Sequence, residues 1–227
     1  AYAQIISEEI LNLPEYGCVN IHGSLLPKYR GASCVQAAII NGDKESGITI
    51  IKMDENLDTG QIIAQKKIEI ENFDTAETLS DKLSALGGEF IVSILKKYIN
   101  NEIKLINQDD NSASYAKKLK KNDGRIDWNK TAEEIEKFTR AMHSWPGAFT
   151  EIEKLKKTLK IIPPVAIIDI NKYKNNELFV YEKKLAVQCK KNSIVIDRLQ
   201  LEGKKETSSE EFLRGYGEKI NIEKNKI

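Results

Sequence analysis

The chain has 227 residues, 41% hydrophobic and 30% charged, a balance typical of globular proteins and unlike that of disordered chains. It has no apolar run of about 18 residues, and its first residues include acids without a basic segment, so neither a membrane span nor a signal peptide is predicted. The net charge of +1 divides into −7 for residues 1–110 and +8 for residues 111–227. A basic second half favours a polyanionic partner, although a Lys-rich composition explains it equally well.

Cysteine and histidine are few and widely spaced. Cys18, Cys34 and Cys189 are odd in number and fit neither a disulfide framework nor a zinc site. Cys34 occupies an apolar helical position, which predicts a buried thiol rather than a nucleophile. His22 and His143 are too far apart to be the usual metal-ligand pair. We therefore expect no metal and a reducing, cytoplasmic location.

The first half of the chain is predicted to be α/β. In chain order, the pattern predicts a helix at 2–12, a buried strand at 18–23, a loop at 24–32, a short helix at 33–41, and strands at 47–53 and 60–70. Asp74 and Glu77 then predict a capping box for a long helix that ends near Tyr98. Three strands are few for the open parallel sheet of an α/β domain. We therefore expect further strands upstream and an N-terminus that is incomplete.

The second half is predicted to be a small β-barrel. Residues 104–124 are polar and basic, and Thr131 and Glu134 form a capping box for a helix that reaches Met142. Short strands are predicted at 149–152, 159–162, 165–170, 177–181, 185–189 and 193–199. Ser208 and Glu211 begin a last short helix.

Three polar residues are candidates for chemistry. Asn20 and His22 are two positions apart on a predicted strand, so their side chains share a face. His22 is the first candidate for proton transfer near neutral pH, and Asp58 lies in the loop LDTG between two strands, where α/β folds place their sites. An amide, an imidazole and a carboxylate together suffice for acyl transfer to an amine. A hydrogen-bonded strand end and an Asp that caps a turn explain the same residues without chemistry.

Two segments of the first half resemble the folate-dependent formyltransferases. They are NIHGSLLPKYRGA (20–32) and GDKESGITIIKMDENLDTG (42–60). The resemblance implies that Asn20 hydrogen-bonds the formyl oxygen of 10-formyltetrahydrofolate, that His22 assists proton movement, and that Asp58 orients His22 and shuttles protons through water. It also implies a folate-binding loop of Met53, Asp54, Glu55, Asn56, Leu57 and Asp58. The cleft for the acceptor amine is implied at Ser24, Leu25, Leu26, Pro27, Arg30 and Gly31.

The rest of the chain resembles methionyl-tRNA formyltransferases in particular. The segments that carry this resemblance are SYAKKLKKNDGRIDWNKTAEEIEKFTRAMHSWPGAFTEI (114–152) and LQLEGKKETSSEEFLRGY (199–216). It implies the C-terminal part of a Rossmann-like formyltransferase domain at 1–103, a linker at 104–122, and an OB-like β-barrel at 123–227. The barrel would bind initiator methionyl-tRNA through basic residues that include Lys204 and Lys205. The sequence departs from the family at Ser33-Cys34-Val35 and at Met142-His143-Ser144, and we expect the family's first βα units to be missing from it.

Three functions are weighed on this basis. The first is transfer of a formyl group from 10-formyltetrahydrofolate to the α-amino group of methionyl-initiator-tRNA. The second is formylation of a sugar nucleotide, which uses the same core but needs no basic groove. The third is a catalytically inactive fragment that binds tRNA. We expect a monomer for an intact protein, and pairing or exchange of segments between copies for a truncated one.

Overall fold

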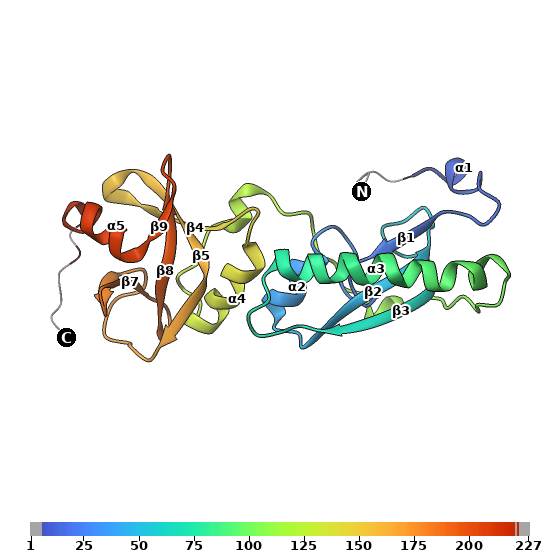
Figure 1. Ribbon diagram of the computed structural model, residues 1–227, viewed down its shortest axis with the longest axis horizontal. Helices are drawn as coiled ribbons and strands as arrows, with labels where there is room; N and C mark the ends of the chain where they lie inside the picture. The colour runs from blue at the N-terminus through green and yellow to red at the C-terminus, as the bar shows by residue number, and fades with distance from the viewer. Residues whose placement is uncertain (1–5, 221, 223–227) are drawn as a thin grey trace. The chain divides into compact units, whose positions relative to one another are not determined.

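A three-stranded sheet is the centre of the first half of the chain (Figure 1). In this computed structural model, which describes residues 6–220 and 222, the strands are β1 Val19–His22, β2 Glu45–Lys52 and β3 Gln61–Glu69, in the order β1-β2-β3. Both strand pairs are antiparallel, whereas the sequence suggested strands of a parallel sheet. The pair of β2 and β3 is antiparallel because the loop that joins these strands is shorter than the crossover of roughly a dozen residues or more that a parallel pair needs.

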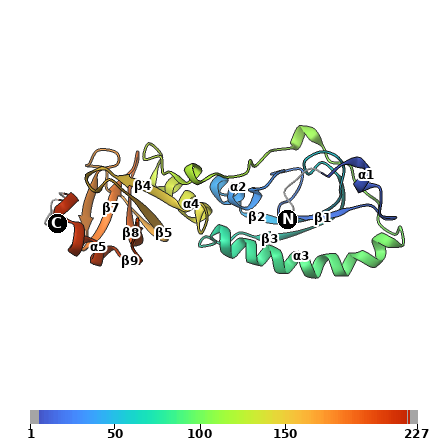
Figure 2. The same ribbon diagram turned by 90° about the horizontal axis from the view of Figure 1, so that it is seen from above.

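Three helices accompany this sheet: α1 Glu8–Leu11, α2 Cys34–Asn41 and α3 Ala76–Ile99. The predicted helix at 2–12 is described only from residue 6 onward, because residues 2–5 lie outside the described residues. α2 ends at Asn41, where the helix predicted at 33–41 was expected to end, and the next residue, Gly42, has a left-handed backbone. α3 runs along one face of the sheet (Figure 2). Gly87 lets it approach closely, since a Cβ there would lie 3.0 Å from Ile21 Cγ2.

The cap of α3 differs from the prediction by one residue. Thr75 is the N-cap, and it exchanges hydrogen bonds with Thr78 three residues later. Asp74 instead accepts hydrogen bonds from the Thr78 hydroxyl and from the Glu71 N–H. The predicted box of Asp74 and Glu77 is therefore wrong, because a threonine pair occupies the geometry one position further along.

Residues 104–119, here called the return segment, follow α3 and run back along the side of the sheet opposite α3 (Figure 2). Ile106 pairs with Ile62 on β3, and the N–H of Ala116 donates to the carbonyl of Arg30 at 2.7 Å. The chain divides into two compact units between Leu119 and Lys120. Most of the segment predicted as a linker at 104–122 thus packs within the first unit.

The second unit is β-rich, as predicted. Its strands are β4 Ala148–Ile152, β5 Lys157–Ile168, β6 Leu178–Tyr181, β7 Lys184–Gln188, β8 Ser193–Leu201 and β9 Glu206–Ser208. They pair antiparallel in the order β4-β5-β8-β7-β6, with β9 on β8. The helices are α4 Ala132–Met142 and α5 Ser209–Tyr216. The predicted capping box of Thr131 and Glu134 is confirmed for α4. Short 3₁₀ turns lie at Asp110–Ser112, Lys121–Gly124, Glu153–Leu155 and Glu218–Ile220.

Two predicted strands of the second unit prove to be one. The strand predicted at 159–162 and residues 165–168 of the strand predicted at 165–170 lie in the single strand β5, whose register shifts between Ile162 and Val165. Two prolines stand at this shift, and proline has no N–H for the ladder, so the sequence there looked like a break. β9 was not predicted, because its three residues are too few to show an alternating pattern. Across the described residues, no helix has the length and apolar character to cross a bilayer.

Candidate active site

β1 carries Asn20 and His22 on one face. In the sheet register Asn20 is opposite Ile51 and His22 is opposite Thr49, so these four side chains lie on the same side. Ile21, between Asn20 and His22, points to the other side, where α3 packs. The predicted shared face is therefore present, and it is the face along which the return segment runs (Figure 2). Asn20 is half-buried and His22 is buried.

The imidazole of His22 has a defined orientation. Its Nε2 lies 2.9 Å from the carbonyl oxygen of Tyr29. A carbonyl can only accept, so Nε2 carries a hydrogen and donates. Nδ1 lies 3.6 Å from Oδ2 of Asp58. Nδ1 is consequently the ring atom that can take up and release a proton, and it faces the carboxylate.

Asp58 lies in the loop between β2 and β3. Its backbone is left-handed, with φ of 54°. Its Oδ2 accepts a hydrogen bond from the Gly31 N–H at 2.7 Å. Residues Tyr29 to Gly31 of one loop thus hold both His22 and Asp58. The structure brings His22 and Asp58 together and places Asn20 on the same strand face as His22.

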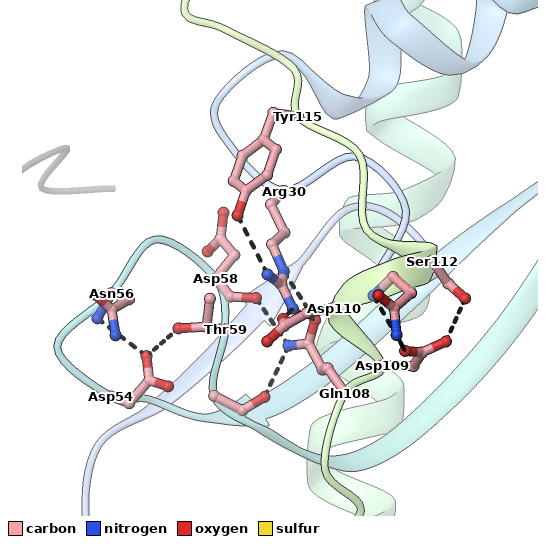
Figure 3. Close-up of polar contacts among 12 residues, drawn as sticks. Arg30, Asp54, Asn56, Asp58, Thr59, Gln108, Asp109, Asp110, Ser112 and Tyr115 are labelled. Atoms are coloured by element: carbon pink, nitrogen blue, oxygen red, sulfur yellow. Dashed lines mark hydrogen bonds and ion pairs between the residues drawn. The ribbon is translucent and has the colours of Figure 1, made fainter.

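Gln108 is a part of this site that the sequence did not reveal (Figure 3). Its Nε2 donates to the carbonyl oxygens of Asp58 and Gly60, both at 2.8 Å. Its Oε1 accepts from Nε and Nη2 of Arg30, at 3.1 and 3.0 Å. Gln108 belongs to the return segment, which was expected to be a linker. A lone polar residue there has no periodicity or motif that could have marked it.

Arg30 was predicted to line the cleft for the acceptor amine, and the structure places its side chain in a buried network. The side chain is 2% exposed. Besides Gln108, it bonds Asp110 at 2.7 Å and the Tyr115 hydroxyl at 3.3 Å (Figure 3). These contacts tie the loop before α2 to the return segment.

The other residues predicted for the acceptor cleft divide between core and loop. Leu26 is buried and packs with Ile51 and Ile62 beneath the sheet face. Ser24 is buried, and its hydroxyl donates to the carbonyl of Lys28. Ser24 and Leu25 line a hollow together with Lys28, Tyr29, Ala38, Asp43, Lys44, Glu45 and Ser46. The carbonyl of Pro27 accepts from the N–H of Ser114 at 3.3 Å, and Gly31 bonds Asp58 as described above.

The predicted folate loop is mostly exposed. Met53 is half-buried, and Asp54, Glu55, Asn56 and Leu57 are exposed. Asp54 braces the loop, because its Oδ1 accepts from the Thr59 hydroxyl at 2.6 Å and from the Asn56 N–H at 3.1 Å (Figure 3). In the second unit, Lys204 and Lys205 are exposed in the turn between β8 and β9.

Cys34 begins α2 close to this site, and its thiol is protonated at neutral pH. Burial raises the pKa of Cys34 to about 11, and the nearby charge of Asp58 acts in the same direction. A thiol in this state is a poor nucleophile. Among the described residues, no group of three or more His, Cys, Asp or Glu side chains is placed to hold a metal ion.

Two family models match the chain. The formyl transferase family matches residues 1–95, and the formyl transferase C-terminal domain matches residues 118–217. Among curated proteins, a methionyl-tRNA formyltransferase of Lachnospira eligens is 39% identical over 221 residues, which are 95% of this chain and 70% of that protein. A methionyl-tRNA formyltransferase of Methylacidiphilum infernorum is 43% identical over 218 residues, which are 94% of this chain and 68% of that protein.

Solved structures with the same fold include two relevant enzymes. The N-formyltransferase from Helicobacter canadensis, in complex with folinic acid and dTDP-3-aminofucose, matches with a TM-score of 0.63 and 27% identity. That match covers 78% of this chain and 65% of the other. The methionyl-tRNA formyltransferase from Clostridium thermocellum matches with a TM-score of 0.58 and 20% identity, over 88% of this chain and 74% of that one. At that identity the second match shows the fold alone.

Proposed function

This chain belongs to the methionyl-tRNA formyltransferase family, and from that premise we propose that it transfers a formyl group from 10-formyltetrahydrofolate to the α-amino group of methionyl-initiator-tRNA. The observation that carries the proposal is the pair formed by His22 and Asp58, with 3.6 Å between Nδ1 and Oδ2 beside Asn20 on the same strand face. Formyl transfer to an amine needs a proton acceptor, a group that orients it, and a donor for the oxyanion.

The chemistry follows from the roles of these side chains. The amine nitrogen attacks the formyl carbon, and a C–N bond forms while the carbonyl oxygen takes on negative charge. The Asn20 amide donates to that oxygen. His22 Nδ1 accepts the proton that the amine loses, and Asp58 orients the ring and passes protons through water. The bond from the formyl carbon to the folate nitrogen then breaks, and that nitrogen takes the proton from His22.

Substrate binding is assigned to both units. We assign the folate to the Met53–Asp58 loop beside the catalytic pair, and the acceptor end of the tRNA to the loop at 24–31. The second unit would bind tRNA phosphates, because clustered lysines attract a phosphate backbone and release counterions. Lys204 and Lys205 are exposed and adjacent, which suits that role.

A sugar-nucleotide amine is the alternative acceptor. The likeness to the Helicobacter canadensis enzyme, solved with dTDP-3-aminofucose, favours it. The curated methionyl-tRNA formyltransferases are more similar, at 39% and 43% identity against 27%, and they support tRNA as the first choice.

The test compares two acceptors in separate reactions of the natural protein that contains these residues. Purified protein is given 10-formyltetrahydrofolate and either methionyl-initiator-tRNA or a nucleotide amino-sugar, and the formylated product is quantified by mass spectrometry. The proposal predicts formylation of the tRNA, lost in a His22→Ala variant. Formylation of the sugar alone would transfer the assignment to the alternative, and binding of tRNA without formylation of either would indicate an inactive binding protein.

A further inference from the structure

The side chain of Gln108 joins two parts of the site that are distant in sequence. Its amide donates two hydrogen bonds to the carbonyls of Asp58 and Gly60, and its oxygen accepts two from Arg30. The orientation of the amide follows from its partners, since carbonyls only accept and a guanidinium only donates. The side chain of Gln108 therefore donates both of its N–H groups to the Asp58 loop and accepts two hydrogen bonds from Arg30 with its oxygen (Figure 3).

Asp58 adopts a conformation that requires support. A non-glycine residue rarely has φ of 54° and keeps it only where surrounding contacts hold it. On the side-chain side, the Gly31 N–H holds the carboxylate. On the main-chain side, Gln108 holds the carbonyl of Asp58 itself and that of Gly60 two residues later. Gly60 in turn packs so tightly that a Cβ there would lie 2.0 Å from the Lys52 carbonyl oxygen, which fixes the end of the loop.

Arg30 connects Gln108, which supports the Asp58 loop, to the loop that orients His22. Its backbone bonds the return segment twice, through the N–H to the Ser114 carbonyl at 2.8 Å and through the carbonyl to the Ala116 N–H at 2.7 Å. Its neighbours Tyr29 and Gly31 contact His22 and Asp58. The hydrogen bonds from Arg30 to Gln108 thus link two loops. One is the loop of Tyr29 to Gly31, which orients His22, and the other is the loop that contains Asp58.

We propose that Gln108 is a positioning residue for formyl transfer, which acts by fixing the backbone of Asp58 so that its carboxylate stays at His22. This assignment of a catalytic consequence rests on the proposed function. The side chain of Gln108 hydrogen-bonds Arg30 and the carbonyls of Asp58 and Gly60, and neither His22 nor the Asp58 carboxylate, so its effect on the reaction passes through the loop. A displacement of about 1 Å in a catalytic group can lower the rate by about 10²-fold, which sets the size of the expected effect.

Two variants separate this role from a simple partnership with Arg30. Gln108→Glu keeps an acceptor for Arg30 and adds a charge that strengthens that bond, but it faces two carbonyls with oxygen instead of N–H. Gln108→Met has a similar length and removes all four hydrogen bonds. If the carbonyl contacts matter, both variants lower kcat about 10²-fold while KM for each substrate stays within a few-fold. If Gln108 serves only Arg30, the Gln108→Glu variant keeps its activity and the proposal is overturned.

Asn107→Ala is the matched control. Asn107 is the preceding residue of the return segment, it is exposed, and its side chain accepts from Gln61 at 2.8 Å. Its loss should leave kcat unchanged. A double-mutant comparison adds a second criterion, because Gln108→Met should cost little further activity once Asp58→Asn has removed the carboxylate. An undiminished loss in that background would show that Gln108 acts by another route.

An activity-independent measurement distinguishes a failure of this proposal from a failure of the proposed function. The Gly31 N–H is bound by the Asp58 carboxylate, so its hydrogen exchange reports whether the carboxylate is in place. Both Gln108 variants should speed exchange at Gly31 by about tenfold or more, the size expected for a lost hydrogen bond to a charged group. Thermal unfolding confirms that each variant is folded under the conditions used. Unchanged exchange at Gly31 would overturn the positioning role whether or not formyl transfer is detected.

Discussion

The side chains of His22 and Asp58, 3.6 Å apart, are each held by a main-chain group of the same short loop. The Tyr29 carbonyl accepts from His22, and the Gly31 N–H donates to Asp58. The residue between these two, Arg30, is anchored in the buried network with Gln108. The separation of the pair therefore depends on one loop, and perturbing that loop should disturb both side chains together.

Replacement of His22 by Ala should lower kcat for formyl transfer about 10²–10⁴-fold, the usual contribution of a general acid–base group. The measurement is initial rate under saturating methionyl-tRNA and folate. His22→Gln, which retains a donor for the Tyr29 carbonyl, is the control for loop structure. Activity within a few-fold of the parent in either variant would remove His22 from the mechanism.

Asn20→Ala should lower kcat about 10²–10³-fold, because it removes a donor to the developing oxyanion. Asn20→Asp is the matched variant: it has nearly the same shape but presents a negative charge to the oxyanion, and it should be at least as damaging. Binding of folate, followed by fluorescence, should change little in Asn20→Ala. Equal losses in binding and turnover would instead assign Asn20 to ground-state binding.

Gly31→Ala should destabilise the protein by roughly 1–3 kcal/mol through strain at a positive φ, with a further cost from a clash. Gly31 has φ of +106°, and a Cβ there would lie 2.6 Å from the Ala116 carbonyl oxygen. Gly203→Ala is the control, because Gly203 also has positive φ, +75°, but nothing lies within 4 Å of its added Cβ. In urea unfolding, Gly31→Ala should lose more stability than Gly203→Ala, because its φ lies further from the left-handed well and its Cβ meets the Ala116 carbonyl oxygen. Equal losses would show that the return segment moves away at Ala116.

Asp74 should contribute stability that acid removes. Burial acts to raise the pKa of this carboxyl, but hydrogen bonds from Lys82, the Glu71 N–H and Thr78 outweigh it and hold the pKa below its ordinary value. The contribution is therefore complete above the unfolded pKa of about 3.9 and is lost as the pH falls through the folded pKa. Compared with Asp74→Asn, the parent should be more stable by roughly 1 kcal/mol at pH 7, with the gap closing below about pH 4. A gap that stays constant with pH would contradict this.

Reversal of Lys204 and Lys205 to Glu should weaken tRNA binding and leave folate binding unchanged. The slope of log affinity against log salt should fall by about one for each phosphate contact removed. Titrations at several salt concentrations measure it. Lys96 and Lys97, near the end of α3 in the first unit, supply a charge-matched control pair for reversal. Equal effects of the two reversals would indicate a general charge effect in place of a tRNA-binding face.

Local signals in the sequence were sufficient for most elements. The left-handed Gly42 after α2, the Thr131 box of α4 and the alternating strands of the second unit all depend on neighbours within a few residues. The same reasoning placed Asn20 and His22 on one face, since alternation along a strand is a local property.

What the sequence could not reveal depends on distant contacts. Gln108 has meaning only because its segment folds back onto a loop 50 residues earlier in the chain. The sequence did not show that the side chain of Arg30 hydrogen-bonds residues 78 to 85 positions later in the chain. The polar and basic composition of residues 104–119 resembles that of a linker. This segment packs on the first unit through backbone hydrogen bonds and single polar side chains, and such packing needs no apolar periodicity in the sequence.

The fold-back of the return segment also orders events in time. β1, β2 and β3 pair with one another through residues no later than Glu69. The Asp58 loop gains its support from Gln108, and the loop that contains Arg30 gains its support from residues up to Ala116. During synthesis, the sheet can therefore form while the ribosome is still producing the segment that completes the site. A nascent chain that has emerged only as far as α3 would lack the hydrogen bonds of Gln108 that hold the backbone of the Asp58 loop.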